Sequence, residues 1–318
     1  LILVVVALYF FFFAPKGGGI VVDTGENPFQ TGGDYTGTGT GQEPDGDTIT
    51  GGEEVAPHLV RITEGPVAFG SLVFLTPKEI VEEEGLDTGT SSAAKAKKTI
   101  FVPEVRYVER KSGNVYKYEF NEKLLSRISN RTLPGIQEAA WTADGKTAFL
   151  RFLSINESGI EVVETYALPT ETEGGYLLEG GLDQVIVSGT STVITLLPST
   201  AGSIATIARA DGANARTLFT SSLSSLRIIP SGKGVSAFTK PSAQMDGFGF
   251  LVSAAGAFDR ILGPYRGFTM LTSPSGKQVV YSYLSGQTIT ASVMDAATRI
   301  PTALPVALLP EKCVWAAD

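Results

Sequence analysis

The sequence is poor in the side chains on which catalysis and metal binding most often depend. It has one cysteine and one histidine among 318 residues, which excludes an intrachain disulfide and a zinc site built from thiolates and imidazoles. The serine-hydrolase pattern Gly-x-Ser-x-Gly is absent, and the lone histidine, His58, lies beside a glycine-rich stretch. We therefore predict no enzyme activity, no catalytic residues, no cofactor and no metal site.

Positive charge is also scarce. Lysine and arginine total 25 against 33 acidic residues, which gives a net charge of −8. Nucleic-acid binding needs a clustered basic face that gains affinity from counterion release, so no nucleic-acid partner is expected. With 43% hydrophobic and 18% charged residues the balance is that of a globular protein, and the 36 glycines favour turns and strands over helices.

Residues 1–14 form an uncharged apolar run that includes four phenylalanines, Phe10 to Phe13. A bilayer span needs about 20 apolar residues, and no small-residue cleavage pattern ends the run, so we interpret it as part of a transmembrane anchor. The alternatives are the core of a cleaved signal peptide and a buried strand. Because the sequence does not begin with methionine, we expect a longer natural chain. The acidic flank predicts that the bulk of the protein is extracytoplasmic, either periplasmic or at the cell surface.

Residues 15–57 are rich in glycine, threonine and acidic side chains, with Lys16 as their single basic residue. Such a segment has too little apolar surface to offset the entropy lost on ordering. We predict a flexible linker between the anchor and the remaining chain, and we expect proteases to cut first within residues 17–54.

Residues 58–318 contain a repeat. Four turns combine a polar residue with a glycine and are followed by a β-rich run, and their glycines lie 44, 43 and 44 residues apart. The turn pairs are Asp144 with Gly145, Ser188 with Gly189, Ser231 with Gly232, and Ser275 with Gly276. A further copy begins where Trp315-Ala-Ala-Asp318 matches Trp141-Thr-Ala-Asp144. Polar-glycine pairs supply the positive φ of tight hairpin turns, so each pair should join two strands.

A period of 43 to 44 residues that holds four strands is typical of a β-propeller blade. One four-stranded sheet cannot bury both of its faces alone, whereas neighbouring repeats can cover them. We predict an all-β fold, a β-propeller of about six visible four-stranded blades, the last one incomplete. Second hairpins are expected at Ser112-Gly113 and at Asp211-Gly212.

Three of these segments resemble the W-S-P-D-G-K turn of TolB-like, WD40-like β-propeller repeats of the PD40 type: Trp141-Thr-Ala-Asp-Gly-Lys146, Ser273-Pro-Ser-Gly-Lys277 and Trp315-Ala-Ala-Asp318. The repeat also occurs in the propellers of dipeptidyl peptidase IV and prolyl oligopeptidase relatives. The layout of anchor, linker and repeat is similar to that of membrane-anchored bacterial surface proteins. The copy at Val185–Gly189 departs from the pattern, since it has neither the tryptophan nor the lysine. The resemblance implies a binding scaffold and names no ligand.

Two further features carry predictions. Trp141 and Trp315 occupy the same repeat position, and we interpret them as wedges between adjacent blades, with ligand-binding aromatics as the alternative. The segment Thr76–Gly85 predicts a short helix with Thr76 as N-cap and Pro77 in the first turn. With the stretch through Lys98 it would form a protruding loop, and plain disorder is the alternative.

Two classes of function remain. The first is a membrane-anchored extracytoplasmic propeller that acts as a non-catalytic scaffold and binds a protein, peptide or glycan. The alternative is a substrate-gating propeller of a larger, peptidase-like enzyme whose catalytic part lies beyond residue 318.

Overall fold

The computed structural model describes residues 60–81, 97–129, 131–232 and 234–316. The chain divides into two units, Leu1–His58 and Leu59–Asp318. The apolar run, the linker and His58 lie outside the described residues. Among the residues that are described, no helix is long and apolar enough to cross a membrane.

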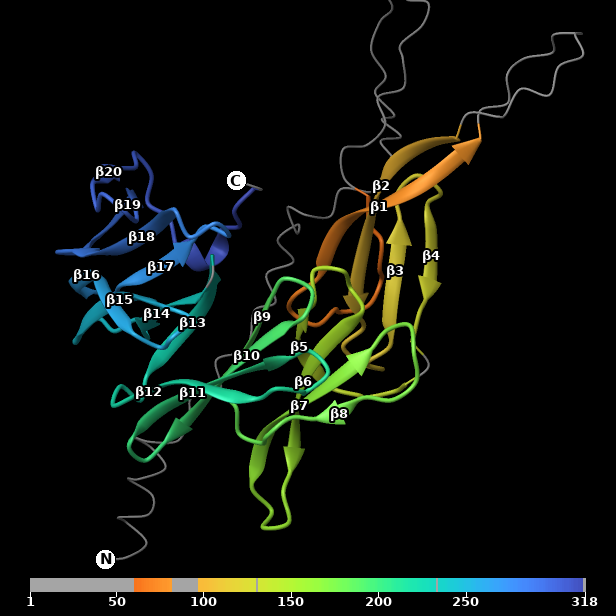
Figure 1. The fold of residues 1–318 in the computed structure, drawn as a ribbon, viewed down its shortest axis with the longest axis horizontal. Coiled ribbons are helices and arrows are strands. Elements are labelled where there is room, and N and C mark those ends of the chain that lie inside the picture. The colour runs from red at the N-terminus through yellow and green to blue at the C-terminus, as the bar shows by residue number, and fades with distance from the viewer. Residues whose placement is uncertain (1–59, 82–96, 130, 233, 317–318) are drawn as a thin grey trace, which may run out of the picture. The chain divides into compact units, whose positions relative to one another are not determined.

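The described chain folds into five four-stranded antiparallel sheets, each a meander of consecutive strands (Figure 1). The first sheet contains β1 (Leu72–Val81), β2 (Lys97–Val108), β3 (Val115–Glu119) and β4 (Leu124–Arg127). The second contains β5 (Ile136–Trp141), β6 (Thr147–Ile155), β7 (Glu161–Pro169) and β8 (Tyr176–Leu177). The third contains β9 (Gln184–Ser188), β10 (Thr192–Ser199), β11 (Gly202–Arg209) and β12 (Arg216–Ser221).

The last two sheets follow the same order. The fourth contains β13 (Leu226–Ser231), β14 (Gly234–Thr239), β15 (Asp246–Val252) and β16 (Phe258–Arg266), and the fifth contains β17 (Thr269–Thr272), β18 (Gln278–Ser285), β19 (Thr288–Asp295) and β20 (Pro301–Ala303). After β20 the described chain has one short 3₁₀ helix, η1 (Pro310–Lys312), and no strand. The all-β fold of four-stranded units is confirmed, and the copy that begins at Trp315 forms no strand up to residue 316.

The repeated glycines occupy equivalent positions in four consecutive sheets. Gly145, Gly189, Gly232 and Gly276 each lie between the first and second strands of a sheet, with φ angles of 69°, 65°, 52° and 76°. Glycine adopts this left-handed region without the steric cost that a side chain adds. The additional hairpins expected at Gly113 and Gly212 are also present, joining β2 to β3 and β11 to β12.

Four apolar clusters hold neighbouring sheets together. Successive side chains of a strand point to opposite faces, so one strand can serve two clusters. In β6, Ala148 and Leu150 pack with Val108 of the first sheet, while Phe149 packs with Val185 of the third. Two corresponding clusters join the third sheet to the fourth and the fourth to the fifth. The sheet-to-sheet burial that the repeat predicts is therefore present.

The helix predicted at Thr76–Gly85 is wrong as far as the structure describes it. Residues up to Val81 belong to β1, which pairs with β2 along its full length, and residues 82–85 lie outside the described part. The Thr76 hydroxyl does not cap a helix but donates to Glu104 Oε2 at 3.3 Å. Pro77 lies in an edge strand, the part of a sheet to which proline is largely confined. Cross-strand pairing has overridden a local helix-start pattern.

An alkaline titration tests the packing between the fourth and fifth sheets. Burial raises the pKa of Tyr281 above its usual value of 10, and the phenols of Tyr265 and Tyr283 reinforce this shift, although a hydrogen bond with Ser292 opposes it. The unfolded chain then loses this proton first, so the free energy of unfolding should fall as pH rises above about 10. The expected result is a shallower fall for Tyr281→Phe between about pH 9 and 11, measured by urea unfolding. An unchanged slope would contradict burial of this phenol.

Candidate functional site

A cleft of about 470 Å³ opens beside the first and second sheets. One wall comes from the chain that follows β4, with Ile128, Ser129 and Arg131. The other comes from the end of β7 and the loop after it, residues 168–174. The loop reads Thr170-Glu-Thr-Glu-Gly174, so hydroxyl and carboxylate groups line the cleft together with one guanidinium.

Arg131 holds the two walls in place. Its guanidinium lies over the ring of Tyr166, 4.9 Å from the ring centre, and Nη1 donates to the carbonyl oxygen of Gly174 at 3.2 Å. The Tyr166 hydroxyl donates to the same carbonyl at 3.0 Å. A cation over an aromatic face adds about 0.5–1 kcal/mol at an exposed site. The loop at the mouth of the cleft is thus positioned by two side chains from separate segments.

The carboxylates of the loop differ in their surroundings. Glu171 Oε1 lies 3.6 Å from Arg106 Nη2 and about half of its side chain is exposed. Glu173 is exposed beside it. A buried charge needs a partner to offset its lost solvation, so it is usually already paired. An exposed carboxylate is solvated by water, which a ligand can displace. Glu173 is accordingly the charged group in the cleft best placed to meet a ligand.

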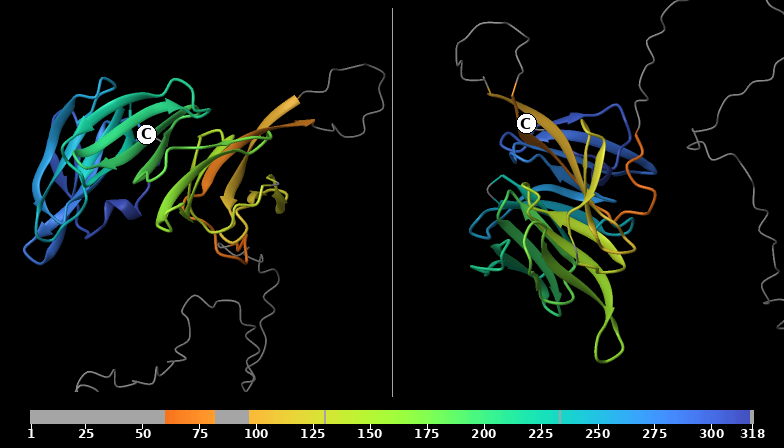
Figure 2. Two further views of the ribbon diagram at one scale, coloured as in Figure 1. Left: turned by 90° about the horizontal axis from the view of Figure 1, so that it is seen from below. Right: turned by 90° about the vertical axis from the view of Figure 1, so that its right-hand side faces the viewer.

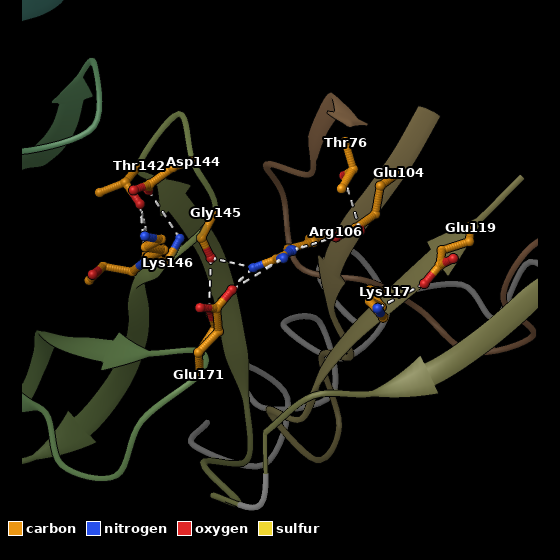
Figure 3. Close-up of polar contacts among 12 residues, drawn as sticks. Thr76, Glu104, Arg106, Lys117, Glu119, Thr142, Asp144, Gly145, Lys146 and Glu171 are labelled. Carbon is orange, nitrogen blue, oxygen red and sulfur yellow. Dashed lines mark hydrogen bonds and ion pairs between the residues drawn. The ribbon is translucent and has the colours of Figure 1, made fainter. Parts of the chain in front are cut away.

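A buried ion pair, Glu104 with Arg106, lies next to Glu171 of the cleft loop (Figure 3). Arg106 Nε lies 2.7 Å from Glu104 Oε1, and Nη1 donates to the carbonyl oxygen of Gly145 at 2.8 Å. Thr170 joins the network, because its hydroxyl donates to the same carbonyl at 2.8 Å and accepts from Arg106 at 3.3 Å. The network links β2 of the first sheet to the repeat turn and the cleft loop of the second.

The carboxylates near the cleft differ in whether they are already paired. Glu104 is the only buried carboxylate in the described ranges, and Arg106 and Thr76 occupy its oxygens. In the same part of the chain, no group of three or more histidine, cysteine, aspartate or glutamate side chains is placed to hold a metal ion. The cleft offers hydroxyl donors, carboxylate acceptors and a cation, which can hold and orient a polar ligand.

The four repeat-turn glycines lie at contacts between sheets. Gly145 presents its carbonyl to Arg106, and the Asp144 carboxylate accepts from the Lys146 N–H at 3.1 Å. Between the second and third sheets, the Ala143 N–H donates to the carbonyl of Gly189, the residue after Ser188, at 2.9 Å. Between the fourth and fifth sheets, the Gly232 N–H donates to the Pro274 carbonyl at 3.0 Å, and the Ser231 hydroxyl lies against Gly276, beside Ser275.

The two tryptophans have different environments. Trp141 is partly buried, packs on the cluster between the first and second sheets, and donates its indole N–H to the Gly70 carbonyl at 2.9 Å. Trp315 is half-buried, and its Nε1 has no hydrogen-bond partner among the described residues. Cys313, which lies two residues before Trp315, is half-exposed.

Sequence reasoning missed the cleft. It assigned no role to Glu171, Glu173 or Arg131, or to the pair of Glu104 and Arg106. One signal was present: opposite charges two residues apart in a strand lie on the same face, and the flanking Val102 and Val108 mark that face as buried. A charged pair on a buried face predicts an ion pair between layers of the fold.

No family model matches the sequence, and no curated protein is similar to it at the level of sequence. Three solved structures illustrate the similarity in structure. An oligogalacturonate lyase from Vibrio parahaemolyticus has a TM-score of 0.48 at 11% identity over 63% of this chain and 62% of its own. TolB from Acinetobacter baumannii has a TM-score of 0.44 at 13% identity over 63% of this chain and 52% of its own. The propeller domain of the trilobed protease from Pyrococcus furiosus has 0.45 at 10% identity, covering 64% and 67%.

The matched part spans less than two thirds of the oligogalacturonate lyase and of TolB. The resemblance to TolB-like propeller repeats is confirmed for the fold, because the chain itself forms five meanders of four strands with the repeat glycine in the same turn. The similar structures include enzymes as well as TolB proteins.

Proposed function

We propose that this protein is a non-catalytic binding scaffold. In this proposal residues 1–14 anchor the chain in a membrane and the sheets stand outside the cytoplasm. The cleft between Ile128, Ser129 and Arg131 on one side and residues 168–174 on the other then receives a protein, peptide or glycan ligand. The observation that carries the proposal is the cleft itself: exposed polar groups surround about 470 Å³ of space, while the one buried carboxylate behind it is already paired.

The residues that line the cleft favour a polar ligand over an apolar one. The Thr170–Gly174 loop supplies hydroxyls, carboxylates and a backbone carbonyl, and Arg131 fixes that loop from the other wall. Apolar lining is limited to Ile128, Leu168 and Pro169. Peptides and glycans both present the donors and acceptors that such a surface can satisfy.

The test is a screen of the purified full chain against immobilised peptides and oligosaccharides, followed by affinity measurements on any ligand found. We expect Glu173→Ala to weaken binding by about tenfold, since a hydrogen bond to a charged group contributes about 1.5–3 kcal/mol. Glu157→Ala is the matched control, because Glu157 is an exposed glutamate in the turn between β6 and β7. Equal losses in the two variants would contradict a role for the cleft. Ligand recovered after incubation should be chemically unchanged.

The alternative proposal is a propeller that controls access to a catalytic domain encoded downstream. Reading the coding sequence beyond residue 318 distinguishes the two. A further domain of roughly 200 residues that contains a Gly-x-Ser-x-Gly turn would favour the gating role.

A further inference from the structure

Two hairpins carry exposed apolar side chains on one face. The strands β1 and β2, and likewise β6 and β7, are longer than the other strands of their sheets and form projecting hairpins (Figure 2). Stripe A consists of Val73, Leu75 and Phe101, which are 63%, 61% and 65% exposed. Stripe B consists of Leu153 and Ile155, which are 56% and 72% exposed. Both stripes consist of apolar residues alone, and the exposed Glu161 lies opposite Ile155 in the β6–β7 ladder.

The strand register fixes the face on which stripe A lies. Val73 pairs with Val105, Leu75 with Pro103, and Pro77 with Phe101, so all three side chains of the stripe share one face of the first sheet. The opposite face carries Arg106 and Val108, which contact the second sheet. Stripe A is therefore on the face that points away from the second sheet. In every later sheet the corresponding face packs on the sheet before it.

Stripe B lies on the face that the second sheet turns toward the third sheet. Leu153 and Ile155 lie four and six residues after Phe149 in β6, so they share its face. Phe149 packs with Val185 and Val193 of the third sheet. Stripe B is thus the part of this contact face that the third sheet leaves exposed.

Each of the four sheet-to-sheet interfaces within the chain joins two kinds of face. One sheet contributes the face that contacts its successor, and the next sheet contributes the face that contacts its predecessor. Between the first and second sheets, Val108 meets Ala148 and Leu150, and the same pairing of faces recurs at the three later interfaces. Stripes A and B are exposed extensions of these two complementary kinds of face. This chain supplies both stripes, so a second copy of it offers the complementary face to each.

We propose that stripe A of one copy of this chain packs on stripe B of a second copy. The contact repeats between chains the apolar sheet-to-sheet packing that holds the sheets together within a chain. A stable interface buries about 800 Å² on each partner, and a few side chains supply less than this. The association is therefore concentration-dependent and suited to detection by cross-linking. This inference is independent of the ligand cleft.

The experiment uses the full chain in which Cys313, the only cysteine, is replaced by serine. One tagged preparation carries Val73→Cys and a second, differently tagged, carries Ile155→Cys. After mixing and treatment with a short bis-maleimide, we expect a doubly tagged dimer at a yield at least about tenfold above that of Val73→Cys mixed with Ile300→Cys, since each tenfold corresponds to about 1.4 kcal/mol of preference. Ile300 is a matched control because it is 67% exposed and belongs to neither stripe.

Further arms make the result decisive. Adding Leu75→Asp and Phe101→Asp to the Val73→Cys chain should reduce the doubly tagged dimer to the yield of the control pair, and an unchanged protease-resistant core would show that this variant still folds. The Val73→Cys chain alone should give no dimer above that background. Equal yields for the Ile155→Cys and Ile300→Cys mixtures would overturn the proposal. A Val73→Cys chain that cross-links to itself as well as to Ile155→Cys would also overturn it.

Discussion

Replacing Arg106 with leucine should lower the free energy of unfolding by about 3–5 kcal/mol, because the substitution leaves Glu104 buried without its counter-charge. Glu104 and Arg106 are 4% and 8% exposed, and the guanidinium also supplies the Gly145 carbonyl with a donor. The change further removes a cation from the face of Phe74, 5.1 Å away. The substitution therefore weakens the contacts between the first and second sheets.

Urea unfolding measures this loss, with Trp141 fluorescence as a local reporter in a Trp315→Phe background. Trp141 packs on the apolar cluster at the same junction. The double variant Glu104→Leu, Arg106→Leu should be more stable than Arg106→Leu alone, since it removes the uncompensated charge together with its partner.

The matched control is Arg209→Leu. Arg209 pairs with Asp211 at 2.6 Å, but both side chains are more than half exposed. Such pairs contribute about 0–1 kcal/mol. A comparable loss in Arg209→Leu and Arg106→Leu would show that burial does not govern the strength of the inner pair.

The repeat was readable from the sequence because its turns depend on local chemistry. Each turn needs a residue with positive φ, so a glycine recurs in the sequence at a fixed interval. The turn glycines Gly145, Gly189, Gly232 and Gly276 all have that conformation. Alternating apolar residues between those marks then specify strands, and four strands per interval specify the sheet. These signals are independent of distant parts of the chain.

The β1–β2 hairpin and the cleft depend on partners that are distant in sequence. Thr76 and Pro77 follow the local pattern of a helix start, yet Pro77 pairs with Phe101 across a strand ladder. Arg131 acquires its role from Tyr166 and Gly174, which come from another sheet. A single sequence records propensity at each position and does not record which distant segment supplies the partner.

The cleft follows from the same junction that the buried pair stabilises. Thr170 binds both the Gly145 carbonyl and Arg106, and it is the first residue of the loop that closes the cleft. A change that loosens Arg106 should consequently move the loop that carries Glu171 and Glu173. Stability of the junction and geometry of the binding loop are thus coupled through one guanidinium.

Alanine substitutions at the repeat glycines should differ in cost according to what faces each turn. Gly189 has a φ of 65° and no atom within 4 Å of the position that a Cβ would take. Gly189→Ala therefore adds only left-handed strain, about 1–2 kcal/mol. Gly145 has a φ of 69°, and its added Cβ would lie 3.0 Å from Arg106 Nη1 and 3.1 Å from Arg106 Cδ.

Gly145→Ala should cost about 2–5 kcal/mol, since overpacking of about 1–3 kcal/mol adds to the same backbone strain. Arg106 cannot withdraw cheaply, because Glu104 and the Gly145 carbonyl hold it from both ends. Urea unfolding of the two variants beside the wild type gives the difference directly. If Gly145→Ala proves no more destabilising than Gly189→Ala, the turn does not press on the buried guanidinium, and the repeat turn at Gly145 serves only its own hairpin.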